Sequence, residues 1–155
     1  MWLFKSKTQA KPARRRLTGQ TVAGLVRESL LEDAATNLRV IIQKDVLACV
    51  TLAELHAVAK KCAMPWLKDV WECEDIARNL VNEAQKVAAN EGCSWAIGTV
   101  RARPPGWAEM QVKPDALHVY VWFIATDGRV YFYDPTALLA VHEDTASLEA
   151  DYAIT

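Results

Sequence analysis

The chain has 155 residues, of which 52% are hydrophobic and 24% are charged, and its formal net charge is −1. This composition is typical of a globular domain with a sizeable core and excludes extensive disorder. No apolar run approaches the roughly 20 residues that cross a bilayer, so a membrane-spanning protein is excluded and no membrane partner is expected.

The N-terminal segment is strongly basic. Residues 1–27 contain seven basic side chains and no acidic one, so the remaining 128 residues carry a net charge of −8. We predict that residues 1–16 are a flexible tail and that residues 17–155 form a single domain. The basic cluster at residues 5–16 is either a solvated tail or a weak, non-specific contact for nucleic acid or an anionic surface. An Arg-rich transit peptide is a third interpretation, although the cluster lacks an amphipathic period.

Cysteine usage indicates a reduced protein. The four cysteines lie 13, 11 and 20 residues apart, and the chain has no CxxC motif and no nearby CxH pairing. We therefore predict no zinc site, no other metal and no cofactor. The opening MWLF is too short for a secretory signal, so a cytoplasmic location is expected.

The first half of the chain has mostly helical patterns. Apolar residues at helical spacing predict a helix from Thr18 to about Ala35. A β-branched run predicts a short strand around Val40–Ile42. The capping-box sequence at Thr51–Glu54 predicts the start of a second helix, which ends before Pro65.

A third helix is predicted from about Glu72 to Asn90, with Gly92 as its C-terminal stop. Cys73 lies among acidic residues at its start, in the sequence WECEDIAR. Carboxylates disfavour a thiolate, whereas a helix N-terminus favours it. Cys73 also shares the apolar stripe of the helix. It is therefore either a small core residue or a nucleophile that points into a cleft between helix and sheet.

Beyond Gly92 the pattern changes from helix to sheet. Arg103–Trp107 reads as a loop, and Pro135 ends the last of the long strands. The predicted strands are Ser94–Val100, Leu117–Ala125, Arg129–Tyr133 and a final edge strand at Tyr152–Ile154. We predict an α+β fold in which the N-terminal helices pack on a small antiparallel sheet.

The hairpin loop decides whether His118 can meet Asp134. A two-residue turn would make His118 face away from Asp134. A three-residue loop, Thr126–Gly128, places Gly128 at the left-handed position and Asp134 opposite Tyr120. His118 is then the diagonal neighbour of Asp134 on the same face, with Cβ atoms roughly 7 Å apart. We therefore expect an imidazole–carboxylate contact.

A cysteine at a helix start, a histidine beginning a strand and an acid ending the next strand suggest Cys–His–Asp catalysis. The thiolate of Cys73 would attack a carbonyl, and helix N–H groups would stabilise the oxyanion. His118 would move the proton, and Asp134 would orient the imidazole. Taken singly, His118 could be a satisfied sheet histidine and Asp134 part of an ordinary turn.

Three short motifs carry a family resemblance. They are CEDIA at residues 73–77, HVYVWFI at residues 118–124 and DGRVYFYDPT at residues 127–136. Their order resembles the papain-like C-terminal domain of the Marasmius agglutinin type, whose relatives also occur in phage genomes. It is also similar to bacterial transglutaminase-like cysteine peptidases. The resemblance covers residues 66–136 and implies a papain-like or transglutaminase-like fold.

The resemblance implies that Cys73 is the nucleophile, His118 the general base and Asp134 the orienting carboxylate. The predicted supporting or groove residues are Asp75, Trp71, Trp107 and Thr136. The predicted function is a papain-like thiol hydrolase, a cysteine peptidase or amidase, that acts on a peptide or protein through an acyl-enzyme.

The alternative is a non-catalytic phage structural or host-interaction protein that binds a protein or nucleic-acid partner through tryptophans and the basic arm. A phage-encoded chain would be found in the host cytoplasm or in the virion.

Overall fold

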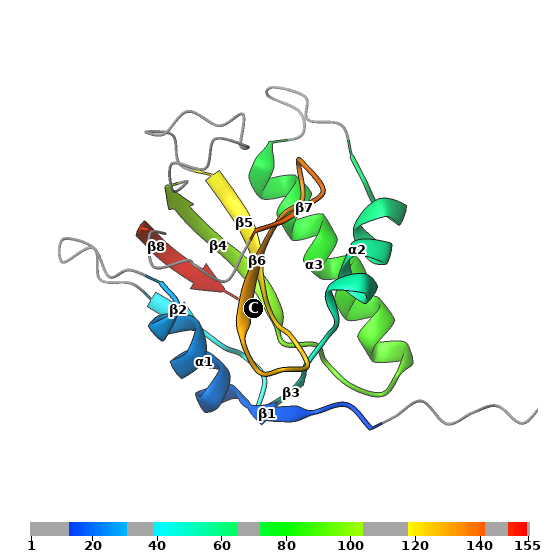
Figure 1. Ribbon diagram of the computed structural model, residues 1–155, viewed down its shortest axis with the longest axis vertical. Coiled ribbons are helices and arrows are strands. Elements are labelled where there is room, and N and C mark those ends of the chain that lie inside the picture. Colours follow the sequence, from blue (N-terminus) through cyan, green and yellow to red (C-terminus); the bar gives the residue numbers. More distant parts are fainter. Residues whose placement is uncertain (1–12, 31–38, 65–71, 104–117, 142–148, 155) are drawn as a thin grey trace, which may run out of the picture.

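The computed structural model describes residues 13–30, 39–64, 72–103, 118–141 and 149–154, which form three helices and eight strands (Figure 1). The helices are α1 (Gly19–Glu28), α2 (Leu52–Lys61) and α3 (Cys73–Asn90). The strands are β1 (Arg16–Thr18), β2 (Arg39–Ile41), β3 (Val46–Ala48), β4 (Ile97–Arg103), β5 (His118–Ile124), β6 (Val130–Asp134), β7 (Leu139–Val141) and β8 (Glu149–Ile154).

Six strands form one sheet in the order β2-β8-β4-β5-β6-β7, and β1 pairs with β3 in a separate antiparallel ribbon. Neighbouring strands of the large sheet are antiparallel except β2 and β8, which are parallel. The predicted α+β class is confirmed. The pattern did not predict the short strands β1, β3 and β7, which have only three residues each.

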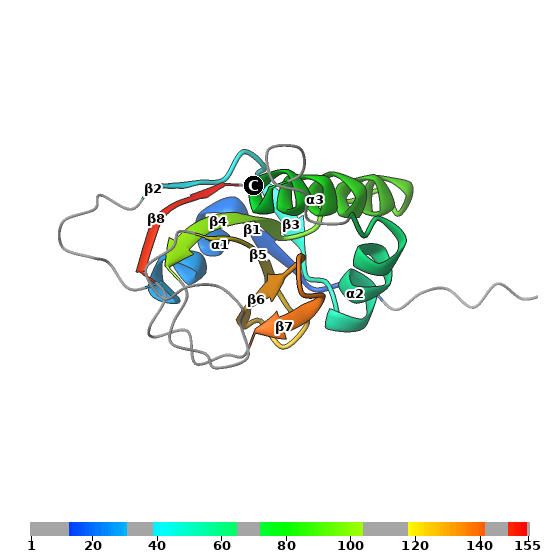
Figure 2. The same ribbon diagram turned by 90° about the horizontal axis from the view of Figure 1, so that it is seen from above.

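The large sheet is buried between α1 on one face and α2 with α3 on the other (Figure 2). Alternate residues of β5 point to the two faces, so that Tyr120 and Trp122 pack with α1 while Val121 and Phe123 pack with α3. Every residue of β5 is buried. The sequence of β5 is therefore a continuous apolar and aromatic run, as expected of a strand covered on both faces.

The helix boundaries follow their capping residues. Thr51 and Glu54 form the predicted capping box of α2, since each backbone N–H donates to the other side chain at 3.0–3.2 Å. Helix α3 ends at Asn90, and Gly92 has the positive φ of 69° that its predicted role requires. Helix α1 ends at Glu28 rather than near Ala35, because Ser29 caps it.

The hairpin between β5 and β6 has the predicted three-residue loop. Val121 pairs with Tyr133, and Ala125 donates a backbone hydrogen bond to Arg129 at 2.9 Å. Gly128 has a φ of 90°, which favours glycine. The register expected for His118 and Asp134 is therefore confirmed.

Arginine side chains fasten the segment before β1 to the domain. The Arg14 guanidinium donates to Glu54 at 2.9 Å and to Glu91 at 3.0 Å, and it lies 5.2 Å from the ring centroid of Trp95. Arg15 donates to the carbonyl of Asp127 at 3.1 Å. The predicted boundary at residue 16 thus lies where the chain already contacts the domain, and residues 1–12 are outside the described part.

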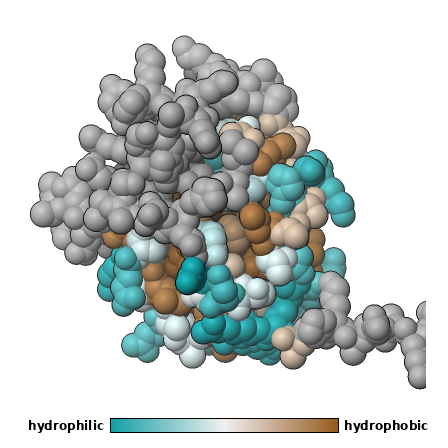
Figure 3. Space-filling view, in the orientation of Figure 1, coloured by the Kyte–Doolittle hydropathy of each residue, from teal (hydrophilic) through white to brown (hydrophobic). Residues whose placement is uncertain are grey.

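The described surface is mixed. In Figure 3, hydrophilic residues and apolar patches alternate on the face shown. Large hydrophobic side chains that stand exposed include Ile41, Val46, Leu52 and Val87. Within the described ranges, no helix combines the length and the apolar composition needed to cross a bilayer.

The Arg14 contacts lead to a prediction about acid stability. The paired guanidinium lowers the pKa of Glu54 from 4.5 to about 2, although burial opposes this shift. A lowered folded-state pKa contributes stability that is present above pH 4.5 and is lost as the pH falls towards 2. Arg14→Ala should therefore lower the free energy of unfolding at pH 7 by about 1–3 kcal/mol. It should also flatten the pH dependence of stability between pH 4.5 and 2, as measured by urea unfolding.

The matched control is Arg15→Ala, because the exposed contact of Arg15 reaches only a backbone carbonyl. This variant should keep the acid-dependent loss. Equal losses of stability in both variants would contradict the role assigned to Arg14.

Candidate functional site

Three element ends meet at the candidate site. Cys73 is the first residue of α3, His118 the first of β5 and Asp134 the last of β6. Helix α3 packs along β5, and the hairpin register brings the end of β6 beside the start of β5. The sequence-predicted trio is therefore assembled by helix packing together with a single hairpin.

A buried contact joins His118 and Asp134. The imidazole Nε2 lies 3.2 Å from the carboxylate Oδ1, and both side chains are almost fully buried. The Tyr120 ring packs edge-on against the imidazole at a centroid distance of 4.8 Å. Nε2 forms no well-aligned hydrogen bond with any described residue. The contact with Asp134 is therefore an ion pair in which the N–H does not point straight at the carboxylate oxygen.

Asp134 is held by the turn that follows it. Oδ1 accepts hydrogen bonds from the Thr136 backbone N–H at 2.8 Å, the Thr136 hydroxyl at 2.6 Å and the Ala137 N–H at 3.3 Å. These three donors occupy the oxygen that faces His118, which explains the off-line approach of the imidazole. Burial tends to raise the pKa of Asp134, but His118 and Thr136 hold it below its usual value. Thr136, a predicted supporting residue, thus fixes the carboxylate in its ionised form.

His118 is a buried cation at neutral pH. Burial alone would lower its pKa, but the contacts with Asp134 and Cys73 raise it from 6.5 to about 9. The contacts with Asp134 and Cys73 therefore outweigh the cost of burying an imidazolium.

Cys73 is half-buried and packs against the core cluster that contains α3. Burial tends to raise the pKa of the thiol, but His118 and the backbone N–H groups of Val119 and Glu74 lower it below the ordinary value. The Glu74 N–H belongs to the first turn of α3, where unpaired donors favour an anion. Cys73 thus packs against the core, and its thiol has a lowered pKa.

The acidic residues around Cys73 have partners of their own. Asp75 accepts a hydrogen bond from the Glu72 backbone N–H at 3.4 Å, so it caps the helix. Arg78 lies 3.8 Å from Asp75 and also forms an ion pair with Glu74. These carboxylates are spread over exposed positions, whereas the buried His118 acts on the sulfur directly. His118 therefore has more effect on the pKa of the Cys73 thiol than these acidic residues have.

Two of the predicted groove residues, Trp71 and Trp107, lie outside the described ranges. The sequence also gave no signal for the backbone donor at Val119 or for the ring of Tyr120 against His118. Among the described residues, no group of three or more His, Cys, Asp or Glu side chains could hold a metal ion.

The fold is similar to that of solved lectin structures. No protein-family model and no curated protein matches the chain. A structure named "PSL1a-E64 complex" matches with a TM-score of 0.68 and 16% identity, over 90% of this chain and 51% of that chain. The Polyporus squamosus lectin, bound to the epitope Neu5Acα2-6Galβ1-4GlcNAc, matches with a TM-score of 0.64 and 17% identity, over 90% and 49%. The chain spans about half the length of these proteins and shares their fold.

These comparisons contradict the predicted function. The neighbours are named for a lectin, a glycan and E64, and neither is named as a hydrolase, a protease or a phage protein. The predictions of a papain-like thiol hydrolase and of a phage structural protein are therefore wrong. The peptide and nucleic-acid partners are not supported either. The resemblance to the Marasmius agglutinin type holds at the level of a fungal-lectin fold.

The thiol pKa can be tested by alkylation. Because the pKa of Cys73 is lowered and that of Cys62 is raised by burial, iodoacetamide at pH 7 should label Cys73 about tenfold faster than Cys62 or more. The rate should decline only as the pH falls through the lowered pKa of Cys73. In His118→Ala the midpoint should move upward, as followed by peptide mass spectrometry. Labelling of Cys73 only after denaturation would contradict the lowered pKa of its thiol.

The role of Asp134 can be tested on His118 itself. In Asp134→Asn the carboxylate charge is lost, so the pKa of His118 should fall from about 9 towards 6.5 in an NMR titration of the imidazole. The control is Asp127→Asn, which removes an exposed acid from the same hairpin and should leave that pKa in place. An unchanged His118 titration in Asp134→Asn would show that the 3.2 Å contact has no electrostatic effect.

Proposed function

We propose that this chain is a ligand-binding domain whose ligand site lies at the Cys73–His118–Asp134 cluster, and that Cys73 captures an electrophilic ligand stoichiometrically. The observation that carries the proposal is the half-buried thiol at the start of α3, together with the buried contact of 3.2 Å between His118 and Asp134. His118 lowers the pKa of this thiol. An ordinary core cysteine needs no neighbouring cation, and titratable groups with shifted pKa values cluster at functional sites.

Capture requires one bond to form and one to break. The thiolate of Cys73 donates an electron pair to an electrophilic carbon of the ligand, such as that of a strained ring. As the carbon–oxygen bond of the ring breaks, the imidazolium of His118 donates its proton to the oxygen. Asp134 keeps the imidazole in place through the contact at 3.2 Å. The product is a thioether that holds the ligand, and no water enters the step.

The similarity to "PSL1a-E64 complex" supplies a probe. Incubation with E64 should increase the mass of the chain by one E64, with the added mass on Cys73. Cys73→Ser should abolish the adduct, and His118→Ala should slow it at least about tenfold because the proton donor and the thiolate are both lost. The measurement is intact-protein and peptide mass spectrometry.

The matched control is Cys62→Ser, which removes another half-buried thiol whose pKa is raised rather than lowered. This variant should react like the parent protein. No adduct, or an adduct on Cys62 or Cys93, would exclude the proposed ligand site.

A second candidate function is the binding of a glycan, and the lectin neighbour with its bound epitope favours it. The two candidates are compatible, because a glycan needs hydrogen-bonding side chains and no reactive thiol. Calorimetry with Neu5Acα2-6Galβ1-4GlcNAc tests this candidate. Binding that persists in Cys73→Ser would place the glycan elsewhere than on the thiol, and no heat from either protein would exclude it for this epitope.

A further inference from the structure

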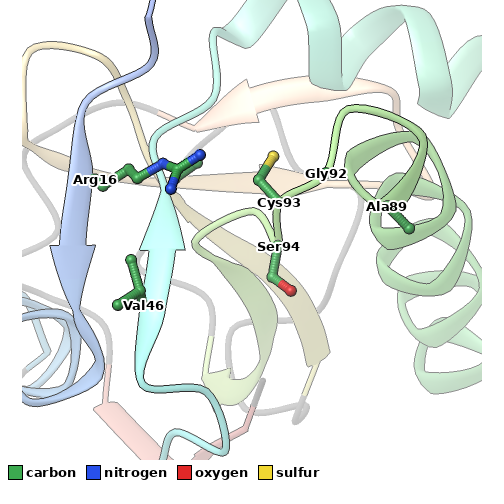
Figure 4. A pocket seen from close by; sticks show the side chains of 7 residues that line it. Arg16, Val46, Ala89, Gly92, Cys93 and Ser94 are labelled. Carbon is green, nitrogen blue, oxygen red and sulfur yellow. The ribbon is translucent and has the colours of Figure 1, made fainter.

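A pocket of about 400 Å³ lies at the opposite end of α3 from Cys73. Ala89, Gly92, Cys93 and Ser94 line one side of it, and β1 and β3 supply Arg16, Val46 and Ala48 (Figure 4). Cys73 and Ala89 are 16 residues apart in α3, so they are separated by about 24 Å along the helix. The pocket is therefore distinct from the candidate site described above.

Arg16 is the charged group of the pocket. Its two neighbours in sequence are occupied, because Arg14 pairs with Glu54 and Glu91 while Arg15 donates to a backbone carbonyl. Among the described residues, the Arg16 guanidinium has no hydrogen-bond or ion-pair partner, and Figure 4 shows the side chain directed towards Cys93. A free guanidinium at a pocket is suited to a planar carboxylate, which it can bind through two hydrogen bonds.

The carbonyl groups at this end of the helix already accept hydrogen bonds, so they do not oppose the binding of an anion to Arg16. Helix C-termini usually carry exposed carbonyls that repel anions. Here the Ala88 carbonyl accepts hydrogen bonds from the N–H groups of Glu91 and Cys93, and the Ala89 carbonyl accepts one from Gly92. The Glu91 carboxylate is turned to Arg14. An anion at Arg16 therefore meets little opposing charge.

The remaining walls select the rest of the ligand. Val46 is 52% exposed and, with Ala48 and Ala89, offers an aliphatic surface. Ser94 adds a hydroxyl that can donate to an oxygen of the ligand. The volume is in the range that small organic ligands occupy. The ligand class is thus a small carboxylate with a short apolar body.

We infer that this pocket is a second ligand site, which binds a small organic acid through Arg16 and Ser94 and packs its aliphatic part against Val46. Cys93 lines the pocket, so it reports occupancy directly: a bound acid would cover the thiol. The proposal is independent of ligand capture at Cys73.

Protection of Cys93 from alkylation tests the site. With butyrate as the probe, the rate of Cys93 labelling by iodoacetamide should fall about fivefold or more at saturation. Butyramide, which has the same shape without the charge, should protect far less. Cys73 serves as the internal reference and should label at the same rate with and without butyrate. Equal protection by butyrate and butyramide, or none by either, would overturn the proposal.

Matched arginine variants distinguish the site from a general charge effect. Arg16→Gln should abolish protection, whereas Arg15→Gln, which removes the same charge one residue away, should retain it. Val46→Glu places a carboxylate beside Arg16 at an exposed position and should also abolish protection without disturbing the core. Loss of protection in Arg15→Gln together with Arg16→Gln would show that only net charge matters. Thermal unfolding of each variant verifies that it is folded.

Discussion

The register of the β5–β6 hairpin is the constraint on which the candidate site depends. Because side chains alternate along a strand, a slip of one residue would turn His118 and Asp134 to opposite faces. Gly128, at a φ of 90°, permits the three-residue loop that sets this register. A side chain at Gly128 would also collide with the Arg15 guanidinium, which reaches across to the carbonyl of Asp127. One glycine thus links the loop, the N-terminal segment and the contact between imidazole and carboxylate.

Charge and burial at the site are balanced by contacts from different parts of the chain. Burial opposes the charged form of all three groups, yet the pKa values of Cys73 and Asp134 are lowered and that of His118 is raised. These pKa shifts arise from contacts among the three groups and from nearby N–H or hydroxyl donors, so the groups are coupled. The pKa of Cys73 can be lowered although acidic residues surround it, because these acids pair with Arg78 or cap the helix.

Local patterns predicted much of this arrangement. The capping box at Thr51, the helix end at Gly92 and the hairpin loop could be predicted from the sequence, because each depends on a few neighbouring residues. The strands β1, β3 and β7 were not predicted, because three residues are too few to show an alternating pattern. The trio of Cys73, His118 and Asp134 could be proposed from order and register. The function of this trio could not be predicted from the sequence, because one fold can carry different functions. The solved neighbours are named for a lectin and for bound ligands.

Helix α3 orders both proposed sites through the direction of its backbone. Its N-terminus presents donors and a partial positive charge, and there the Cys73 thiol, whose pKa is lowered, lies at the first turn. At its C-terminus the last carbonyls accept hydrogen bonds from the turn that contains Gly92. The charged group of the pocket there is the guanidinium of Arg16 from β1. A helix dipole alone would favour an anion only at the first end. The free Arg16 reverses that preference at the second, so two anion-preferring positions can lie on one helix about 24 Å apart.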